Sequence, residues 1–132
     1  MGGEEQRGSL SPMNLEVRTR AISPELAVVE LIGEADVYSS PLAKDVMLKL
    51  LESGTRNLIV DLEKADYLDS TALGLLVGML KRVRERDGSL GLLNPKPRVK
   101  KVFEITRLDQ VFPFYESESQ AIAAMSGKGQ AR

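Results

Sequence analysis

The sequence predicts an α/β protein in which a mixed β-sheet is backed by helices. Three observations lead to this fold class: short apolar runs with the length of strands, longer segments with the period of amphipathic helices, and the alternation of the two along the chain. We expect about four strands, with room for a short fifth, and about four helices. The length of 132 residues, with 42% hydrophobic and 28% charged residues, suits a single globular domain.

The first half of the chain predicts a hairpin and a helix. Residues 14–19 alternate apolar and polar side chains, and a second apolar run over 26–32 follows a proline. The short link between them predicts antiparallel pairing, and Gly33 is expected to end the second strand. Ser40 followed by proline has the pattern of a helix start, and apolar residues then recur every four positions until Gly54.

The second half alternates strands and helices. The nearly continuous apolar run over 58–62 is typical of a central strand, and a helix is expected over 70–87. Residues 89–93 predict the fourth strand. Short helices are expected over 98–105 and 117–125, which gives the order β-β-α-β-α-β-α-α.

One domain is expected over residues 14–125. The polar, glycine-containing segments 1–13 and 126–132 are expected to be flexible tails. No apolar leader precedes the domain, and the longest apolar run, 72–80, is far shorter than the roughly 20 residues that span a bilayer. We therefore expect a cytoplasmic protein without a membrane partner.

The composition argues against an enzyme. Cysteine and histidine are both absent, which excludes disulfides, thiolate nucleophiles and a Ser-His-Asp triad, and makes a metal site improbable. No Walker-type phosphate loop is present. The net charge of −1 offers no long-range attraction for nucleic acid. We predict a binding protein with no catalytic residue, no metal and no cofactor.

Three loops follow the carboxyl ends of expected strands: residues 33–36, 67–70 and 94–97. In sheets with parallel βα units such loops gather at one end of the molecule, where ligands and partners bind. We therefore expect the following side chains to be neighbours on one exposed surface: Asp36, Asp69, Ser70 and Asn94.

Ser70 and its neighbours permit two interpretations. Ser70 or Asp69 is placed to cap the amides of the first helical turn, which is the commonest reason for either residue at a helix start. A hydroxyl at this point is also a good phosphorylation site, because free amides and the positive end of the helix dipole stabilise an anion. The two roles are compatible.

Two further residue pairs also leave alternatives open. Gly74 and Gly78 lie one helical turn apart, which indicates either close packing of that helix face or a smooth surface for a partner helix; the residues alone favour packing. Glu34 and Asp36 could form an acid/base pair, but two carboxylates in a turn are more often solvated.

The string Leu-Asp-Ser-Thr-Ala-Leu-Gly over 68–74, placed after the strand 58–62, resembles the phosphorylation motif of the anti-sigma factor antagonists, members of the STAS domain family. Two further loops and one late segment fit the same family in the correct order: residues 33–36 with Ser40-Pro41, residues 93–95 and residues 107–112. The similarity covers about residues 14–125.

The resemblance implies a STAS-like fold and a regulatory cycle in stress response or sporulation. The unphosphorylated antagonist would bind an anti-sigma factor that is also a serine kinase, and so free a sigma factor for transcription. The kinase would phosphorylate Ser70, with Thr71 as second choice, and a PP2C-type phosphatase would restore binding. The predicted partner-binding residues are Glu34, Asp36, Ser39, Asp69, Ser70, Thr71, Gly74, Gly78 and Asn94.

Two alternatives come from other classes. Ala72 stands where the family usually has glycine, and a methyl there is expected to narrow the approach to Ser70. This favours a STAS scaffold or transport-associated subunit without a phosphorylation cycle. A small nucleotide-binding or hydrolytic enzyme on the same loop surface is the second alternative, and the absence of histidine, cysteine and a Walker loop counts against it.

Overall fold

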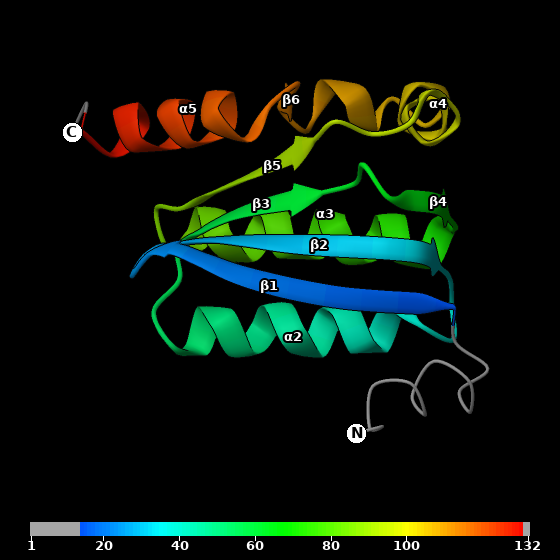
Figure 1. Cartoon of the computed structure of the whole chain (residues 1–132), viewed down its shortest axis with the longest axis horizontal. Helices are drawn as coiled ribbons and strands as arrows, with labels where there is room; N and C mark the ends of the chain where they lie inside the picture. Colours follow the sequence, from blue (N-terminus) through cyan, green and yellow to red (C-terminus); the bar gives the residue numbers. More distant parts are fainter. Residues whose placement is uncertain (1–13, 131–132) are drawn as a thin grey trace.

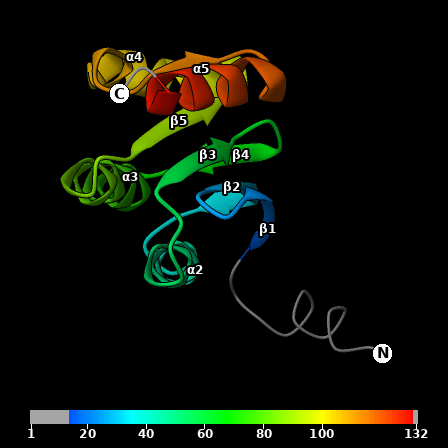
Figure 2. The same cartoon turned by 90° about the vertical axis from the view of Figure 1, so that its left-hand side faces the viewer.

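The computed structural model describes residues 14–130, with side chains up to Met125, and places a twisted sheet between helices (Figures 1 and 2). The helices α2 and α3 begin at the same end of the sheet (Figure 1). In chain order the elements are β1 (Leu15–Ser23), β2 (Leu26–Ala35), α2 (Ser40–Glu52), β3 (Asn57–Asp61), β4 (Ala65–Leu68), α3 (Ser70–Glu85), β5 (Ser89–Leu93), α4 (Pro97–Ile105), the 3-10 turn η1 (Leu108–Gln110), β6 (Phe114–Tyr115) and α5 (Glu118–Gln130).

The sheet is mixed, with a strand order of β1-β2-β3-β5-β6. β1 pairs antiparallel with β2, whereas β2, β3, β5 and β6 pair in parallel. β2 is long enough to serve two neighbours, because β3 pairs with Leu26–Glu30 and β4 pairs with the stretch from Gly33 to Ala35. The pairing with β4 carries the chain to the end of the sheet at which α3 begins.

Alternation along the strands divides the apolar side chains between the two faces of the sheet. In β2, Val29 and Leu31 pack into a core that includes Met47 of α2 and Leu76 of α3. Val28, on the opposite face, belongs to a smaller cluster under α5, whose members are Leu26, Val28, Ile59, Leu93, Ala121 and Met125. α2 and α3 therefore cover one face, and α5 covers part of the other (Figure 2).

The predicted fold class is confirmed, and the antiparallel hairpin and the strand 89–93 are observed as expected. Six strands are present in the described residues, against the expectation of about four with room for a short fifth, because β4 and β6 were missed. β2 also does not end at Gly33 but continues to Ala35. Gly33 has a φ of +103° at an irregularity in the pairing with β4, where a side chain would meet the carbonyl oxygen of Asn14.

The ends of the helices also differ from the expectation. Ser39, rather than Ser40, precedes the first turn of α2. The helix expected over 70–87 ends at Glu85, and α5 continues past Met125 to Gln130, into the segment expected to be a tail. The tail expected at residues 1–13 lies outside the described residues.

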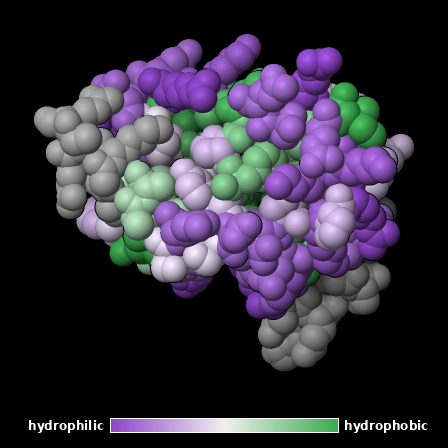
Figure 3. Space-filling model, turned by 90° about the horizontal axis from the view of Figure 1, so that it is seen from above, coloured by the Kyte–Doolittle hydropathy of each residue, from purple (hydrophilic) through white to green (hydrophobic). Residues whose placement is uncertain are grey.

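The surface over α4 and α5 is mostly hydrophilic, with apolar residues in patches between the charged ones (Figure 3). Among the helices of the described range, none combines the length and apolar character needed to cross a membrane.

Candidate functional site

The pairing of β2 with β4 brings two of the three predicted loops together. Ala35 lies opposite Leu68, and the amide of Asp69 donates a hydrogen bond of 3.0 Å to the carbonyl oxygen of Ala35. Asp36 therefore follows β2 at the point where Ser70 begins α3. This juxtaposition confirms that the loops after the second strand and before the second long helix share one end of the sheet.

Asp69, and not Ser70, caps α3. Its side-chain oxygen Oδ1 accepts a hydrogen bond of 3.0 Å from the amide of Ala72, which satisfies one of the free donors of the first turn. Ser70 is exposed, and its hydroxyl makes no hydrogen bond to any described residue. The capping interpretation is therefore wrong for Ser70. The serine presents a free hydroxyl at the positive end of a helix of 16 residues, and exposed Thr71 lies beside it.

Asp36 organises the turn between β2 and α2. Its Oδ1 accepts hydrogen bonds of 2.9 Å from the amides of Tyr38 and Ser39 and lies 3.0 Å from the hydroxyl of Ser39, which can donate to it. These donors, the Ser39 amide foremost, lower the pKa of Asp36 below its ordinary value, against an opposing effect of partial burial. The Asp36 side chain is therefore a carboxylate that holds its own loop.

Ser39 is a positioning residue of that turn and not a contact residue. Its side chain is fully buried; its oxygen accepts from the amide of Asp36 at 2.9 Å and lies 3.0 Å from the carbonyl oxygen of Glu34. The prediction that Ser39 contacts a partner is therefore wrong, because no surface of the residue is available. Glu34, in contrast, is exposed on β2 opposite Tyr67 of β4.

Ala72 does not narrow the approach to Ser70. The residue is 2% exposed and packs within the core beneath α3, and its amide is the group that Asp69 caps. Its methyl group therefore faces the interior, and the expected obstruction at the surface is not observed.

Three apolar side chains that the sequence analysis missed surround this end of the sheet. Val37 and Tyr38 in the turn before α2 are 53% and 76% exposed, and Tyr67 on β4 is 51% exposed. Exposed aromatic side chains are enriched in protein interfaces and are otherwise costly to leave in water. The sequence signal that could have found them is the apolar pair Val37-Tyr38, which continues neither the alternating pattern of β2 nor the helical spacing of α2.

Gly74 and Gly78 open a groove between α2 and α3. A methyl group added at either glycine would meet no atom within 4 Å, so the interpretation as close packing is wrong within this chain. Each glycine nevertheless costs about 1 kcal/mol of helix stability relative to alanine. The groove has a volume of about 500 Å³, and its lining residues are Ser40, Pro41, Lys44, Thr71, Gly74, Leu75, Gly78, Met79 and Arg82.

Asn94 is the predicted site residue of the third loop, and it is exposed. It follows β5, which pairs with β3 and β6, and its amide donates to the carbonyl oxygen of Tyr115 at 2.9 Å. No hydrogen bond joins it to Asp36, Asp69 or Ser70. The loop after β5 instead reaches β4 through an ion pair between Lys96 and Asp66. Within the described residues, no cluster of His, Cys, Asp or Glu side chains could hold a metal ion.

Comparisons with known proteins show the family and the fold of the chain. The family model of the STAS domain matches residues 14–121. The chain is 40% identical over 96 residues to the anti-sigma-B factor antagonist of Staphylococcus aureus, an alignment that covers 73% of this chain and 88% of that protein. The solved structure of the anti-sigma factor antagonist SpoIIAA in its unphosphorylated form matches with a TM-score of 0.76 and 26% identity, over 85% of this chain and 97% of that one. The phosphorylated form of the Bacillus protein SpoIIAA shares the fold, with a TM-score of 0.67 and 24% identity over 83% of this chain and 98% of that one.

Proposed function

Because this chain belongs to the STAS domain family and resembles its anti-sigma factor antagonists, we propose that it binds an anti-sigma factor through the surface around Ser70. Phosphorylation of Ser70 ends the binding, and the unphosphorylated form releases a sigma factor. The anti-sigma factor is itself the serine kinase, and a PP2C-type phosphatase restores the binding form.

One observation carries this proposal: the hydroxyl of Ser70 is exposed and unbonded at the N-terminus of α3, while Asp69 does the capping. A serine that capped the helix would lose its hydrogen bond on modification. Here the hydroxyl takes no part in the fold, so a kinase can modify it without removing a structural contact. The free amides and the positive end of the helix dipole then favour the phosphate.

Phosphorylation is proposed to act on the interface rather than on the fold. A phosphate adds a charge of about −1.5 to −2 at pH 7. That charge lies at the same end of the sheet as Tyr38 and Tyr67, whose exposed rings are the apolar part of the proposed interface. Burying an unpaired charge against apolar side chains costs several kcal/mol, and each 1.4 kcal/mol lowers the affinity about tenfold.

The burial of Ala72 supports the phosphorylation cycle over a scaffold without one. The alternative of a phosphorylation-free STAS scaffold depended on a methyl group that blocks Ser70, and this methyl group lies in the core. The solved forms of SpoIIAA, one unphosphorylated and one phosphorylated, show that the fold accommodates both states in that protein.

The experiment is a comparison of the free chain before and after phosphorylation by the host's homologue of the anti-sigma-B factor. Intact-mass analysis should find one added phosphate, and amide exchange of the two free forms should be alike outside the loop before Ser70. The phosphorylated form should no longer bind the kinase. No uptake of phosphate would refute the cycle, and loss of protection throughout the sheet would replace the interface account with an unfolding switch.

A further inference from the structure

The groove between α2 and α3 is chemically uneven. Its base is apolar, with half-buried Leu75 and buried Met79, and its middle has no side chains because Gly74 and Gly78 lie there. Its charged lining residues, Lys44 on α2 and Arg82 on α3, are both cations. No acidic residue lines the groove, and the positive ends of both helices lie at the Ser70 end (Figure 1).

The spacing of the glycines suits a helix as the occupant. Gly74, Gly78 and Arg82 follow one another at intervals of four residues, which is one of the rows along which helices pack. Two members of this row have no side chain, so the row is a channel in the surface of α3. The ridge of side chains at intervals of four on another helix fits such a channel, and the absence of Cβ atoms permits a close approach.

A buried hydroxyl in the groove wall has no partner of its own. Ser40 is 3% exposed, and its Oγ is the buried side-chain oxygen that lacks a hydrogen bond within the part of the chain that the structure describes. Buried hydroxyls are nearly always bonded. Ser40 Oγ is buried in the free chain, so the groove wall has to shift before a carboxylate or carbonyl oxygen of an occupant can accept this hydrogen bond.

We propose that this groove binds an amphipathic helix of the anti-sigma factor, one that carries acidic side chains beside its apolar stripe. The apolar stripe rests on Leu75 and Met79, and the acidic side chains meet Lys44 and Arg82. The inference rests on the proposed function and names the part of the partner that is recognised.

The position of the groove also explains how phosphorylation of Ser70 lowers the affinity for the partner helix. Thr71 lines the groove and is the residue after Ser70, so a phosphate on Ser70 lies at the end of the groove. The negative charge lowers the attraction of a basic groove for an acidic helix, in addition to its desolvation cost at the tyrosines. Phosphorylation thus opposes binding at both parts of the surface.

The first test uses substitutions that should raise stability while they lower affinity. In Gly74→Ala/Gly78→Ala the added methyl groups meet no atom of this chain, so the melting temperature should rise, yet they fill the channel. The affinity for the host's homologue of the anti-sigma-B factor, measured by titration calorimetry, should fall at least tenfold. Ser40→Ala should leave stability equal or higher and lower the affinity severalfold. Glycine variants that bind as tightly as the wild type overturn the proposal.

The second test addresses charge with a matched control. Arg82→Glu and Lys81→Glu change the net charge equally and at adjacent exposed positions of α3, but only Arg82 lines the groove. Arg82→Glu should weaken binding at least tenfold and reduce its dependence on salt concentration, whereas Lys81→Glu should change the affinity less than threefold. Equal effects of the two variants would mean that general charge, and not the groove, attracts the partner.

The outcomes separate the two proposals. If the wild-type chain does not bind the anti-sigma factor homologue, the proposed function fails. If it binds, and phosphorylation ends the binding, while the groove variants behave as the wild type, only the helix proposal fails. In a separate experiment, ATP and inorganic phosphate are each titrated into the chain in the absence of the partner. Binding of either one that Arg82→Glu abolishes and Lys81→Glu does not would make the groove an anion site and would also overturn the helix proposal.

Discussion

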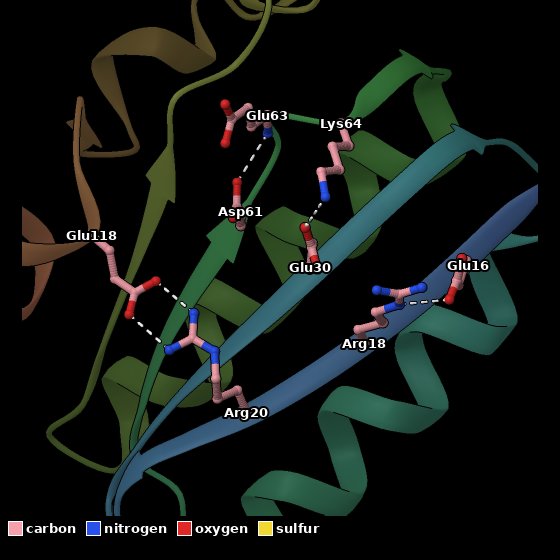
Figure 4. Close-up of polar contacts among 8 residues, drawn as sticks. All are labelled: Glu16, Arg18, Arg20, Glu30, Asp61, Glu63, Lys64 and Glu118. Atoms are coloured by element: carbon pink, nitrogen blue, oxygen red, sulfur yellow. Dashed lines mark hydrogen bonds and ion pairs between the residues drawn. The ribbon is translucent and has the colours of Figure 1, made fainter.

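Two surfaces of the molecule differ in their polar and aromatic groups: the open side of the sheet and the surface around Ser70. On the open side, where neither α2 nor α3 lies, charged side chains of β1 and β2 are paired within β1, with α5 or with the turn after β3 (Figure 4). Arg20 makes two hydrogen bonds to Glu118 at 2.6 and 2.8 Å, and Lys64 lies 3.6 Å from Glu30. At the Ser70 end, the groups that stand out are exposed tyrosines, a free hydroxyl and an open groove.

This difference indicates which surface awaits a partner. Paired surface charges keep a protein in solution and contribute little to stability, typically below 1 kcal/mol a pair. Exposed aromatic rings, two glycines in a helix and an unbonded buried hydroxyl are each unfavourable in the free chain. Their concentration beside α2 and α3 is explained by a partner, whereas the open side needs none. We expect the following variants to test that contrast.

The largest effect is expected from Ser70→Ala, which should abolish phosphate incorporation. Because Asp69 does the capping, the free energy of unfolding should change by less than about 0.5 kcal/mol. Intact-mass analysis after incubation with ATP and the kinase, beside a denaturation curve, measures both. One phosphate on Thr71 in this variant would show that the phosphoacceptor was assigned wrongly.

The exposed tyrosines should have the next largest effect. Tyr38→Ala/Tyr67→Ala should weaken binding of the anti-sigma factor about a hundredfold, or about 2.7 kcal/mol, with little change in melting temperature. Ile105→Ala is the matched control, because Ile105 is 72% exposed on α4 and does not line the groove. If Ile105→Ala weakens binding as much as the double variant, the surface around Ser70 is not the specific binding surface.

Asp36→Asn should weaken kinase binding or slow phosphorylation of Ser70 about tenfold at neutral pH, about 1.4 kcal/mol. The amide oxygen of asparagine can still accept from Tyr38 and Ser39, so the melting temperature there should change little. Unchanged affinity and rate would remove Asp36 from the interface.

The pH dependence of stability gives a second measurement on the same variant. The pKa of Asp36 is lowered in the folded state, so its contribution to stability is present above the ordinary value of 3.8 and is lost as pH falls through the folded value. Asparagine does not titrate in this range. Asp36→Asn should therefore flatten the acid limb of a stability-against-pH curve, and an identical limb in both proteins would contradict the geometry of this turn.

The smallest effect is expected on the open side, at Asp61. Partial burial raises the pKa of Asp61, and nearby Glu30, Glu63 and Glu118 add to this, while a hydrogen bond from the Glu63 amide opposes it. Its contribution is therefore favourable below the ordinary value of 3.8 and is lost as pH rises through the raised folded value. Asp61→Asn should be more stable than the wild type at neutral pH, by less than about 0.5 kcal/mol, and should bind the partner normally. A loss of affinity would bring the open side into the interface.

The sequence was sufficient for elements whose signal is local. β5 was predicted at residues 89–93, as observed, because an apolar run stands there between clear turn residues. β4 was missed because its two central residues, Asp66 and Tyr67, are exposed and only its ends are buried. Gly33 was interpreted as a strand end because sequence alone does not show that β2 continues into a second pairing partner.

A site residue was predictable from the sequence where a motif identifies it. It was not predictable where its exposure depends on packing. Ser70 was found from the string around it, and Asp36 from its loop. The roles of Gly74 and Gly78 were misjudged because the sequence does not show whether an atom lies opposite a helix face. Ser39 was misplaced on the surface for the same reason, since its burial depends on how the turn folds back onto Asp36.

The most direct measurement of the contrast between the two sides is amide hydrogen exchange on the chain alone and in complex with the anti-sigma factor. The account predicts that protection rises in Asp36–Lys44 and in Ser70–Arg82, the segments that carry the turn and the groove. Exchange in Arg18–Arg20 and around Glu30, on the open side, should not change. Protection gained in β1 and β2 with none along α3 would contradict it.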